Sequence, residues 1–211
     1  RYLGYKKNID DTYSLWLTKN LELEKINQIE DELNIEGYEN TFPLARAIKR
    51  EIIIHIGPTN SGKTYGAVKQ MLESDSGIYL APLRLMANEC YEDIISKNID
   101  CSLITGEERI INEQAKFVSS TVEMCQFQNR IDVAIIDEIQ MIADPYRGWA
   151  WTQALVGVSA NKVFLVGSEE CLPYVIPIIN SLGEKYKIVK HDRKNPLEVR
   201  DTINKSSLWV L

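Results

Sequence analysis

The chain has 211 residues, 45% of them hydrophobic and 26% charged, so it can form a domain with its own core and global disorder is not expected. Its net charge of -6 argues against a strongly basic nucleic-acid surface, although an acidic chain can bind nucleic acid through a local groove. No apolar run is long enough to span a bilayer, so we expect no membrane partner.

The first 41 residues predict a small helical appendage. Leucine and isoleucine recur at loosely helical spacing in "DTYSLWLTKNLELEKINQIEDEL", and Pro43 marks a boundary. We expect this appendage to pack on the main domain, and a separate partner-binding module is the alternative. The chain begins with Arg1 rather than Met, so a native targeting segment is not visible in it.

Residues 42–192 alternate short apolar runs with helical stretches. The expected strands are "EIIIHI" (51–56), "GIYLAP" (77–82), "CSLIT" (101–105), "KFVSST" (116–121), "DVAIID" (132–137), "KVFLVG" (162–167) and "KYKIVK" (185–190). Helices are expected from Gly62 and within 85–96, 149–158 and 172–182. Strands this apolar are typical of burial on both faces, so the pattern predicts an α/β fold with a parallel sheet sandwiched between helices. Residues 193–211 read as a polar linker and, at "LWVL", the start of a further lobe.

"GPTNSGKT", after the first expected strand, fits the phosphate-binding pattern G-x-x-x-x-G-K-[ST]. The predicted nucleotide-binding residues are Gly57, Pro58, Thr59, Asn60, Ser61, Gly62, Lys63 and Thr64. Glycines let successive backbone N–H groups surround an anion, and the following helix directs its positive end at the same anion. Lys63 would reach the β- and γ-phosphates of ATP, and the Thr64 hydroxyl would bind Mg²⁺.

"IDVAIIDEIQ" supplies the acidic partner that such a loop needs, and we expect it on a neighbouring strand. Asp137 would follow a buried strand at its carboxyl end, where α/β sheets place their ligands. It is expected to hold Mg²⁺, and Glu138 to orient and deprotonate the attacking water. Paired carboxylates permit hydrolysis without proving it.

"DEIQ" has the form of motif II of the DExH/D-box helicases of superfamily two, and other segments resemble further motifs of the same helicases. "APLRLMANE" (81–89), "TGEER" (105–109), "SSTVEM" (119–124) and "VGSEE" (166–170) resemble motifs Ia, Ib, a further RNA-contacting motif and motif III. Together, "GPTNSGKTY", "TGEER", "TVEM" and "IDEIQMIADPYRGWAWTQALVG" resemble RNA helicases of the mitochondrial degradosome type and their bacterial relatives. This resemblance covers roughly residues 42–200.

The resemblance implies the first RecA-like lobe of a two-lobed motor that binds ATP between its lobes and single-stranded or partly duplex RNA across both. Gln140 would be a catalytic residue that couples the nucleotide site to the RNA path. The implied RNA-binding residues are Pro82, Arg84, Thr105, Gly106 and Thr121. Solvated or capping roles remain the alternatives for Arg84 and Thr121.

Two further segments have no assigned role. Trp149 and Trp151 are expected in the core, with base stacking as the alternative, and Arg147 is expected to form a local ion pair with Asp144. "RAIKR" (46–50) is expected to be either a solvated basic turn or a contact to the nucleotide.

Two alternatives stay open. A thymidine kinase of the zinc-lid type shares the loop and a "DE.Q" segment, but it needs two CxxC pairs. Here Cys90, Cys101, Cys125 and Cys171 are scattered, so no zinc site is expected and the thiols are predicted to be buried and reduced. A non-catalytic P-loop scaffold is the second alternative, although the intact loop and acidic pair argue against it.

The resemblance also implies what lies outside these residues. The second lobe would supply an arginine finger, so we expect this chain alone to bind nucleotide weakly, hydrolyse it very slowly and unwind nothing. RNA degradation with an exoribonuclease partner is implied for the intact protein. The bacterial cytoplasm is the first expected compartment, with the mitochondrial matrix as the alternative.

Overall fold

The computed structural model describes residues 37–58 and 61–192. The chain divides into two compact units, Arg1–Thr41 and Phe42–Leu211. Apart from residues 37–41, the appendage predicted for 1–41 lies outside the described residues, as does the linker predicted for 193–211.

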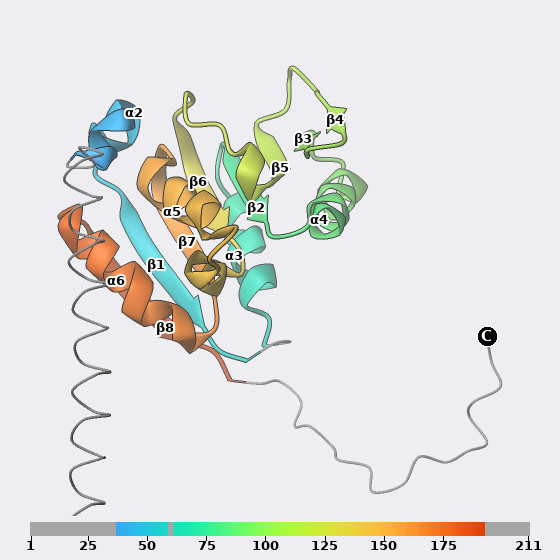
Figure 1. Ribbon diagram of the computed structural model, residues 1–211. Coiled ribbons are helices and arrows are strands. Elements are labelled where there is room, and N and C mark those ends of the chain that lie inside the picture. Colours follow the sequence, from blue (N-terminus) through green and yellow to red (C-terminus); the bar gives the residue numbers. More distant parts are fainter. Residues whose placement is uncertain (1–36, 59–60, 193–211) are drawn as a thin grey trace, which may run out of the picture. The chain divides into compact units, whose positions relative to one another are not determined.

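The described residues form eight strands, and helices connect most of them (Figure 1). The strands are β1 (Glu51–Ile56), β2 (Gly77–Ala81), β3 (Cys101–Ile104), β4 (Arg109–Ile110), β5 (Phe117–Thr121), β6 (Ile131–Ile136), β7 (Ala160–Gly167) and β8 (Lys185–Lys190). The α-helices are α2 (Pro43–Arg46), α3 (Lys63–Leu72), α4 (Arg84–Ser96), α5 (Gly148–Gly157) and α6 (Leu172–Ser181). Short 3-10 helices are η1 (Tyr38–Thr41), η2 (Val122–Met124), η3 (Ile139–Ala143) and η4 (Glu169–Cys171).

The strands form one sheet in the order β4-β3-β5-β2-β6-β7-β1-β8. Every pairing is parallel except β3 with the two-residue strand β4, which the sequence did not predict. All the parallel strands therefore end at one edge of the sheet, and the loops that follow them share that edge. The predicted α/β fold with its parallel sheet is confirmed.

The alternation of side chains along each strand separates two hydrophobic layers. On β1 and β6, Ile54 and Ile136 pack with Trp151 and Leu155 of α5 and with residues of α6. Val133 and Ile135 of β6 point to the other face, where the buried residues of α3 and α4 pack. The sheet is thus covered by α5 and α6 on one face and by α3 and α4 on the other (Figure 1).

Candidate active site

The predicted phosphate loop connects β1 to α3. Gly62 caps the helix in the left-handed conformation, with φ +82° and ψ 15°. A residue with a Cβ would pay about 1–2 kcal/mol there, so the last glycine of the motif has a structural reason. The N-terminus of a ten-residue helix directs its free N–H groups to the space beside the loop. Thr59 and Asn60 lie outside the described residues.

Lys63 lies inside the curve of this loop. Its ammonium donates hydrogen bonds to the carbonyl oxygens of Gly57 and Pro58, both at 2.7 Å, and lies 3.4 Å from the Ser61 hydroxyl. The lysine side chain is buried with Ser61. The loop carbonyls therefore already hold the Lys63 ammonium inside the loop, where it would contact a bound anion.

Asp137 follows β6 and is only 1% exposed. The Thr64 hydroxyl donates to its carboxylate at 3.3 Å, the Tyr79 hydroxyl at 2.8 Å and the Glu138 backbone N–H at 2.9 Å. Burial raises the pKa of Asp137, while the hydrogen bonds from Tyr79 and Glu138 act against that rise. A buried carboxylate of this kind would be stabilised by a bound cation.

The phosphate loop and Asp137 do not follow neighbouring strands, so the expectation that they would is wrong. β7 lies between β6, which carries Asp137, and β1, which leads to the loop. Adjacent strands are about 4.8 Å apart, so two spacings leave roughly 10 Å between the strand ends. That gap allows space for phosphate oxygens and metal-bound water, and the Thr64 side chain reaches across it from the start of α3.

Glu138 and Gln140 connect this site to the end of β7. Glu138 has a left-handed backbone, with φ 48° and ψ 47°, which is costly for a residue with a side chain. The Gln140 amide donates to the Glu138 carboxylate, and its oxygen accepts the backbone N–H of Ser168 at 3.1 Å. A Cβ on Gly167 would lie 2.3 Å from that oxygen, so a larger residue at this position would displace the Gln140 amide.

The implied RNA-binding residues lie at the same edge of the sheet, over the adjacent strands β3, β5 and β2. Thr105 follows β3, Thr121 ends β5 and Pro82 follows β2. The predicted nucleotide residues follow β6 and β1, which lie on the other side of β2 with β7 between them. Strand order therefore divides the edge into two regions that meet between β2 and β6.

Within the RNA group the side chains differ in exposure. Arg84 and Gly106 are exposed, and the Arg84 guanidinium pairs with Glu107. Thr105 is 1% exposed, and its hydroxyl accepts the Glu108 N–H at 3.0 Å, so it closes the turn instead of facing solvent. Thr121 is also buried. Arg84 and Gly106 are thus the members of this group that present surface to a ligand.

The "RGWAWT" segment differs from its prediction in two places. Trp151 is fully buried as expected, but Trp149 is 58% exposed, because the two residues lie on different sides of α5. The Arg147 guanidinium pairs with Glu123 at 2.7 Å instead of Asp144. The Asp144 carboxylate accepts the backbone N–H groups of Arg147 and Tyr146, which lower its pKa.

Both predictions for "RAIKR" are wrong for its arginines. The Arg50 guanidinium is buried and donates to the carbonyls of Leu155 and Val158 at the end of α5 and to both carboxylate oxygens of Glu184. Arg46 donates to the Val156 carbonyl. These groups lie at the amino end of β1, the opposite end from the phosphate loop, so they support the fold and do not face the nucleotide.

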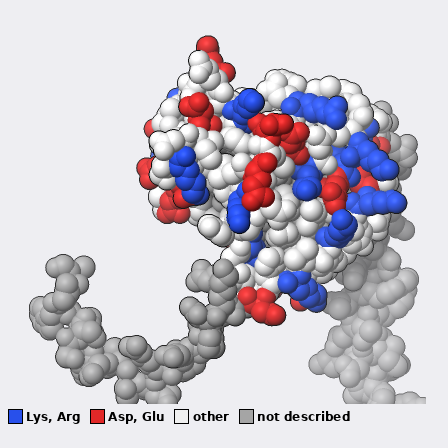
Figure 2. Space-filling model, turned by 180° about the vertical axis from the view of Figure 1, so that it is seen from behind, with Lys and Arg blue, Asp and Glu red and all other residues white. Residues whose placement is uncertain are grey.

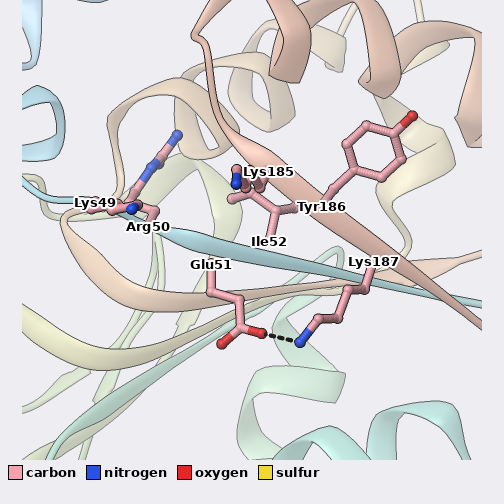
Figure 3. Close-up of a pocket in the computed structure, with 7 residues that line it drawn as sticks. All are labelled: Lys49, Arg50, Glu51, Ile52, Lys185, Tyr186 and Lys187. Carbon is pink, nitrogen blue, oxygen red and sulfur yellow. Dashed lines mark hydrogen bonds and ion pairs between the residues drawn. The ribbon is translucent and has the colours of Figure 1, made fainter.

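A hollow of about 410 Å³ lies at that opposite end of the sheet (Figure 3). Its lining comes from the starts of β1 and β8 and includes the ion pair between Glu51 and Lys187. None of the predicted phosphate or magnesium residues lines it. We therefore place the candidate site at the phosphate loop and not in this hollow.

Charges of both signs are interspersed on the face shown in Figure 2. The four cysteines are free, and burial raises the pKa of Cys125 to about 12, so its thiol is neutral. Among residues 37–58 and 61–192, no three His, Cys, Asp or Glu side chains form a metal cluster, and no helix is long and apolar enough to cross a membrane.

The chain is similar to known helicases. Residues 39–191 match the family described as the DEXQ-box helicase domain of Suv3. The mouse ATP-dependent RNA helicase SUPV3L1, a mitochondrial protein, is 41% identical over 202 residues, which cover 92% of this chain and 26% of the relative. The mitochondrial SUV3 helicase of Saccharomyces cerevisiae is 46% identical over 165 residues, covering 76% and 22%.

A solved DEAD box protein from Methanococcus jannaschii has the same fold, with a TM-score of 0.52 at 20% identity over 65% of this chain and 44% of that protein. The chain spans about a quarter of the length of the curated relatives named above. Those relatives are mitochondrial, which agrees with the second of the two expected compartments, and nothing here supports the bacterial cytoplasm.

Proposed function

Because this chain belongs to the family of DEXQ-box helicase domains of Suv3, we propose that it is the ATP-binding, RecA-like lobe of an ATP-dependent RNA helicase. In the full-length protein, hydrolysis of Mg-ATP would drive movement along single-stranded RNA and the separation of partly duplex RNA. One observation carries the proposal: the Thr64 hydroxyl of the phosphate loop meets the buried Asp137 carboxylate at 3.3 Å. The family match favours this activity over a thymidine kinase or a non-catalytic scaffold.

The phosphate loop would bind the triphosphate of ATP. Backbone N–H groups of the phosphate loop, which Pro58 alone lacks, would surround the β-phosphate at the positive end of α3. Lys63 would exchange its hydrogen bonds to the Gly57 and Pro58 carbonyls for bonds to the β- and γ-phosphates. This exchange needs only a small movement, since the ammonium already lies in the loop.

Thr64 and Asp137 fit a magnesium ion. A hydroxyl and a carboxylate oxygen 3.3 Å apart are the hard oxygen ligands that Mg²⁺ prefers, and phosphate oxygens and waters would complete its six ligands. When bound, the ion supplies positive charge to the phosphate oxygens. Tyr79 and the Glu138 N–H would hold the Asp137 carboxylate in place for it.

Glu138 would orient the attacking water and accept its proton. Gln140 holds the Glu138 carboxylate from one side and the backbone of Ser168 from the other. A movement at the end of β7 would therefore shift the Glu138 carboxylate through Gln140. This contact supports the coupling role predicted for Gln140.

The loops after β3, β5 and β2 would bind the RNA backbone without reading its sequence. Arg84 and Gly106 have exposed surface for phosphate contact, and Pro82, Thr105 and Thr121 would shape the loops. An exoribonuclease partner, a role in RNA degradation and the mitochondrial matrix as compartment complete the proposal. These rest on the family resemblance.

Two substitutions in the full-length protein test this function. Lys63→Ala should abolish tight ATP binding, measured with a fluorescent ATP analogue, because the phosphates lose their main cation. Glu138→Gln should retain that binding but lose RNA-stimulated ATP hydrolysis, because the amide cannot accept a proton. Lys69→Ala, which removes an exposed lysine from the same helix, is the matched control and should leave both unchanged.

Normal hydrolysis by Glu138→Gln would show that Glu138 is not the base. A wild-type protein whose ATPase activity does not respond to RNA, under conditions where it binds ATP, would contradict the helicase function itself.

A further inference from the structure

One arginine contacts two of the loops that are assigned to RNA. The Arg147 guanidinium donates from its Nη2 to the Pro82 carbonyl at 2.7 Å and to the Glu123 carboxylate at 2.7 Å, and from its Nε to the same carboxylate oxygen at 3.0 Å. Pro82 follows β2 and Glu123 belongs to η2, directly after β5. Arg147 thus holds together two of the loops assigned to RNA.

The same guanidinium lies over the ring of Trp151, 5.3 Å from its centroid. This distance is within the range of a favourable cation–π contact. The indole N–H of Trp151 donates to the backbone carbonyl of Asp137 at 2.9 Å. The connection therefore continues from the RNA loops to the residue that would hold magnesium.

The backbone of Arg147 is itself fixed. Its N–H donates to the Asp144 carboxylate at 2.8 Å, and the Gly148 N–H donates to the Asp144 carbonyl at 2.9 Å. Trp151 is fully buried, so its ring has no freedom to move independently of α5. A displacement of the Pro82 or Glu123 loop would therefore act on α5 and on the end of β6 instead of being absorbed by a flexible side chain.

We propose that Arg147 is a positioning residue that couples RNA binding at the loops after β2 and β5 to the geometry of Asp137, acting through Trp151. Strands β5, β2 and β6 are adjacent in the sheet, so this bridge joins three consecutive strand ends. The inference rests on the proposed function and adds the path between its two ligands. Because coupling is reciprocal, bound ATP would also tighten the hold on RNA through the same contacts.

The test uses the full-length protein and compares ATP hydrolysis without RNA and with saturating single-stranded RNA. Arg147→Lys keeps the charge but loses the planar group that donates to two acceptors and stacks on the indole. We expect the RNA-stimulated rate to fall about 10-fold or more, within the usual range of coupling between sites. The rate without RNA should change less than about 3-fold, because no phosphate or magnesium residue is altered.

Two further variants test the two contacts of Arg147, with Glu123 on the RNA side and with Trp151 on the Asp137 side. Glu123→Gln should lower RNA stimulation, and combined with Arg147→Lys it should add little, because both act through one contact. Trp151→Phe keeps most of the packing but removes the N–H that reaches Asp137, and it should also uncouple RNA from hydrolysis. Thermal melts of each variant separate this effect from loss of folding.

Arg130→Ala is the control, because it removes an exposed arginine that directly precedes β6, at the end of the strand opposite to the site, and that donates to Asn161 near the start of β7. It should retain full RNA stimulation. The proposal is overturned if folded Arg147→Lys and Trp151→Phe keep the wild-type stimulation, or if they lower the rates with and without RNA equally. A wild type that RNA does not stimulate would instead refute the proposed function, and the bridge with it.

Discussion

At the scale of single residues, the nucleotide site depends on groups that meet through space. Asp137 is held by hydroxyls from Thr64 and Tyr79, which lie far from it in sequence. Tyr79 was not among the predicted site residues. Its only sequence signal is a polar hydroxyl within the otherwise apolar run "GIYLA", and that signal does not say which neighbour the hydroxyl reaches.

The contact between His55 and His191 predicts that the stability of the protein depends on pH. His55 on β1 lies 3.2 Å from His191, Nδ1 to Nε2. Burial, with a smaller contribution from His191, lowers the pKa of His55 from 6.5 to about 4. The pKa of His191 is lowered by burial and by the nearby Lys63 charge.

Between pH 6.5 and about 4 the unfolded chain therefore binds more protons than the folded chain, so the free energy of unfolding should decrease as pH falls through this window. The contribution of His55 is at most about 3 kcal/mol. His55→Gln, which cannot titrate, should show a shallower decrease in urea denaturation at pH 7, 6 and 5. Equal slopes for the two proteins would contradict the assignment.

At the scale of elements, α5 is fixed at both ends by arginines. Arg147 lies at its start, and Arg50 binds the carbonyls of Leu155 and Val158 at its end. The guanidinium of Arg50 also joins this helix end to Glu184, just before β8. A helix C-terminus has carbonyls without helical partners, and a buried cation satisfies them well.

Arg50→Met should therefore destabilise the 211-residue chain by about 3–5 kcal/mol, because it leaves the Glu184 carboxylate without its main partner in a buried setting. Lys187→Met removes an exposed ion pair with Glu51 and serves as the control, with an expected loss below about 1 kcal/mol. Urea denaturation midpoints at pH 7 measure both. Similar small losses for the two variants would show that the buried cluster adds little.

At the scale of the whole molecule, one edge of the sheet carries both proposed ligand sites, with the proposed RNA residues over β3, β5 and β2 and the proposed nucleotide residues over β6 and β1. In the proposed function, this lobe would supply the phosphate loop, the acidic pair and part of the RNA path. The transition state of phosphoryl transfer also needs positive charge that, in this family resemblance, comes from a second lobe.

The 211-residue chain alone should therefore hydrolyse ATP about 10³-fold or more slowly than the full-length protein with RNA, since an arginine finger contributes roughly 10³–10⁵ in related enzymes. It should not separate a duplex RNA that carries a single-stranded tail. A strand-displacement assay and an ATPase assay on both proteins measure this. Measurable unwinding by the chain alone would contradict a two-lobe mechanism.

The sequence by itself determined the local features. The loop "GPTNSGKT", the acidic pair and the alternation of apolar strands with helices were readable because they depend on backbone conformation, side-chain chemistry and periodicity within a few residues. The structure confirms the parallel strands, and Gly62 lies at the start of α3 as expected. The family resemblance added the second group of residues at the same edge.

Only the tertiary structure decided which of these features meet. It placed β7 between the two halves of the nucleotide site, brought Tyr79 to Asp137 and directed Arg147 to Glu123 instead of Asp144. It also left Trp149 exposed while burying Trp151. These outcomes depend on strand order and on the packing of helices against the sheet. Such contacts join residues dozens of positions apart, and no local pattern in the chain encodes them.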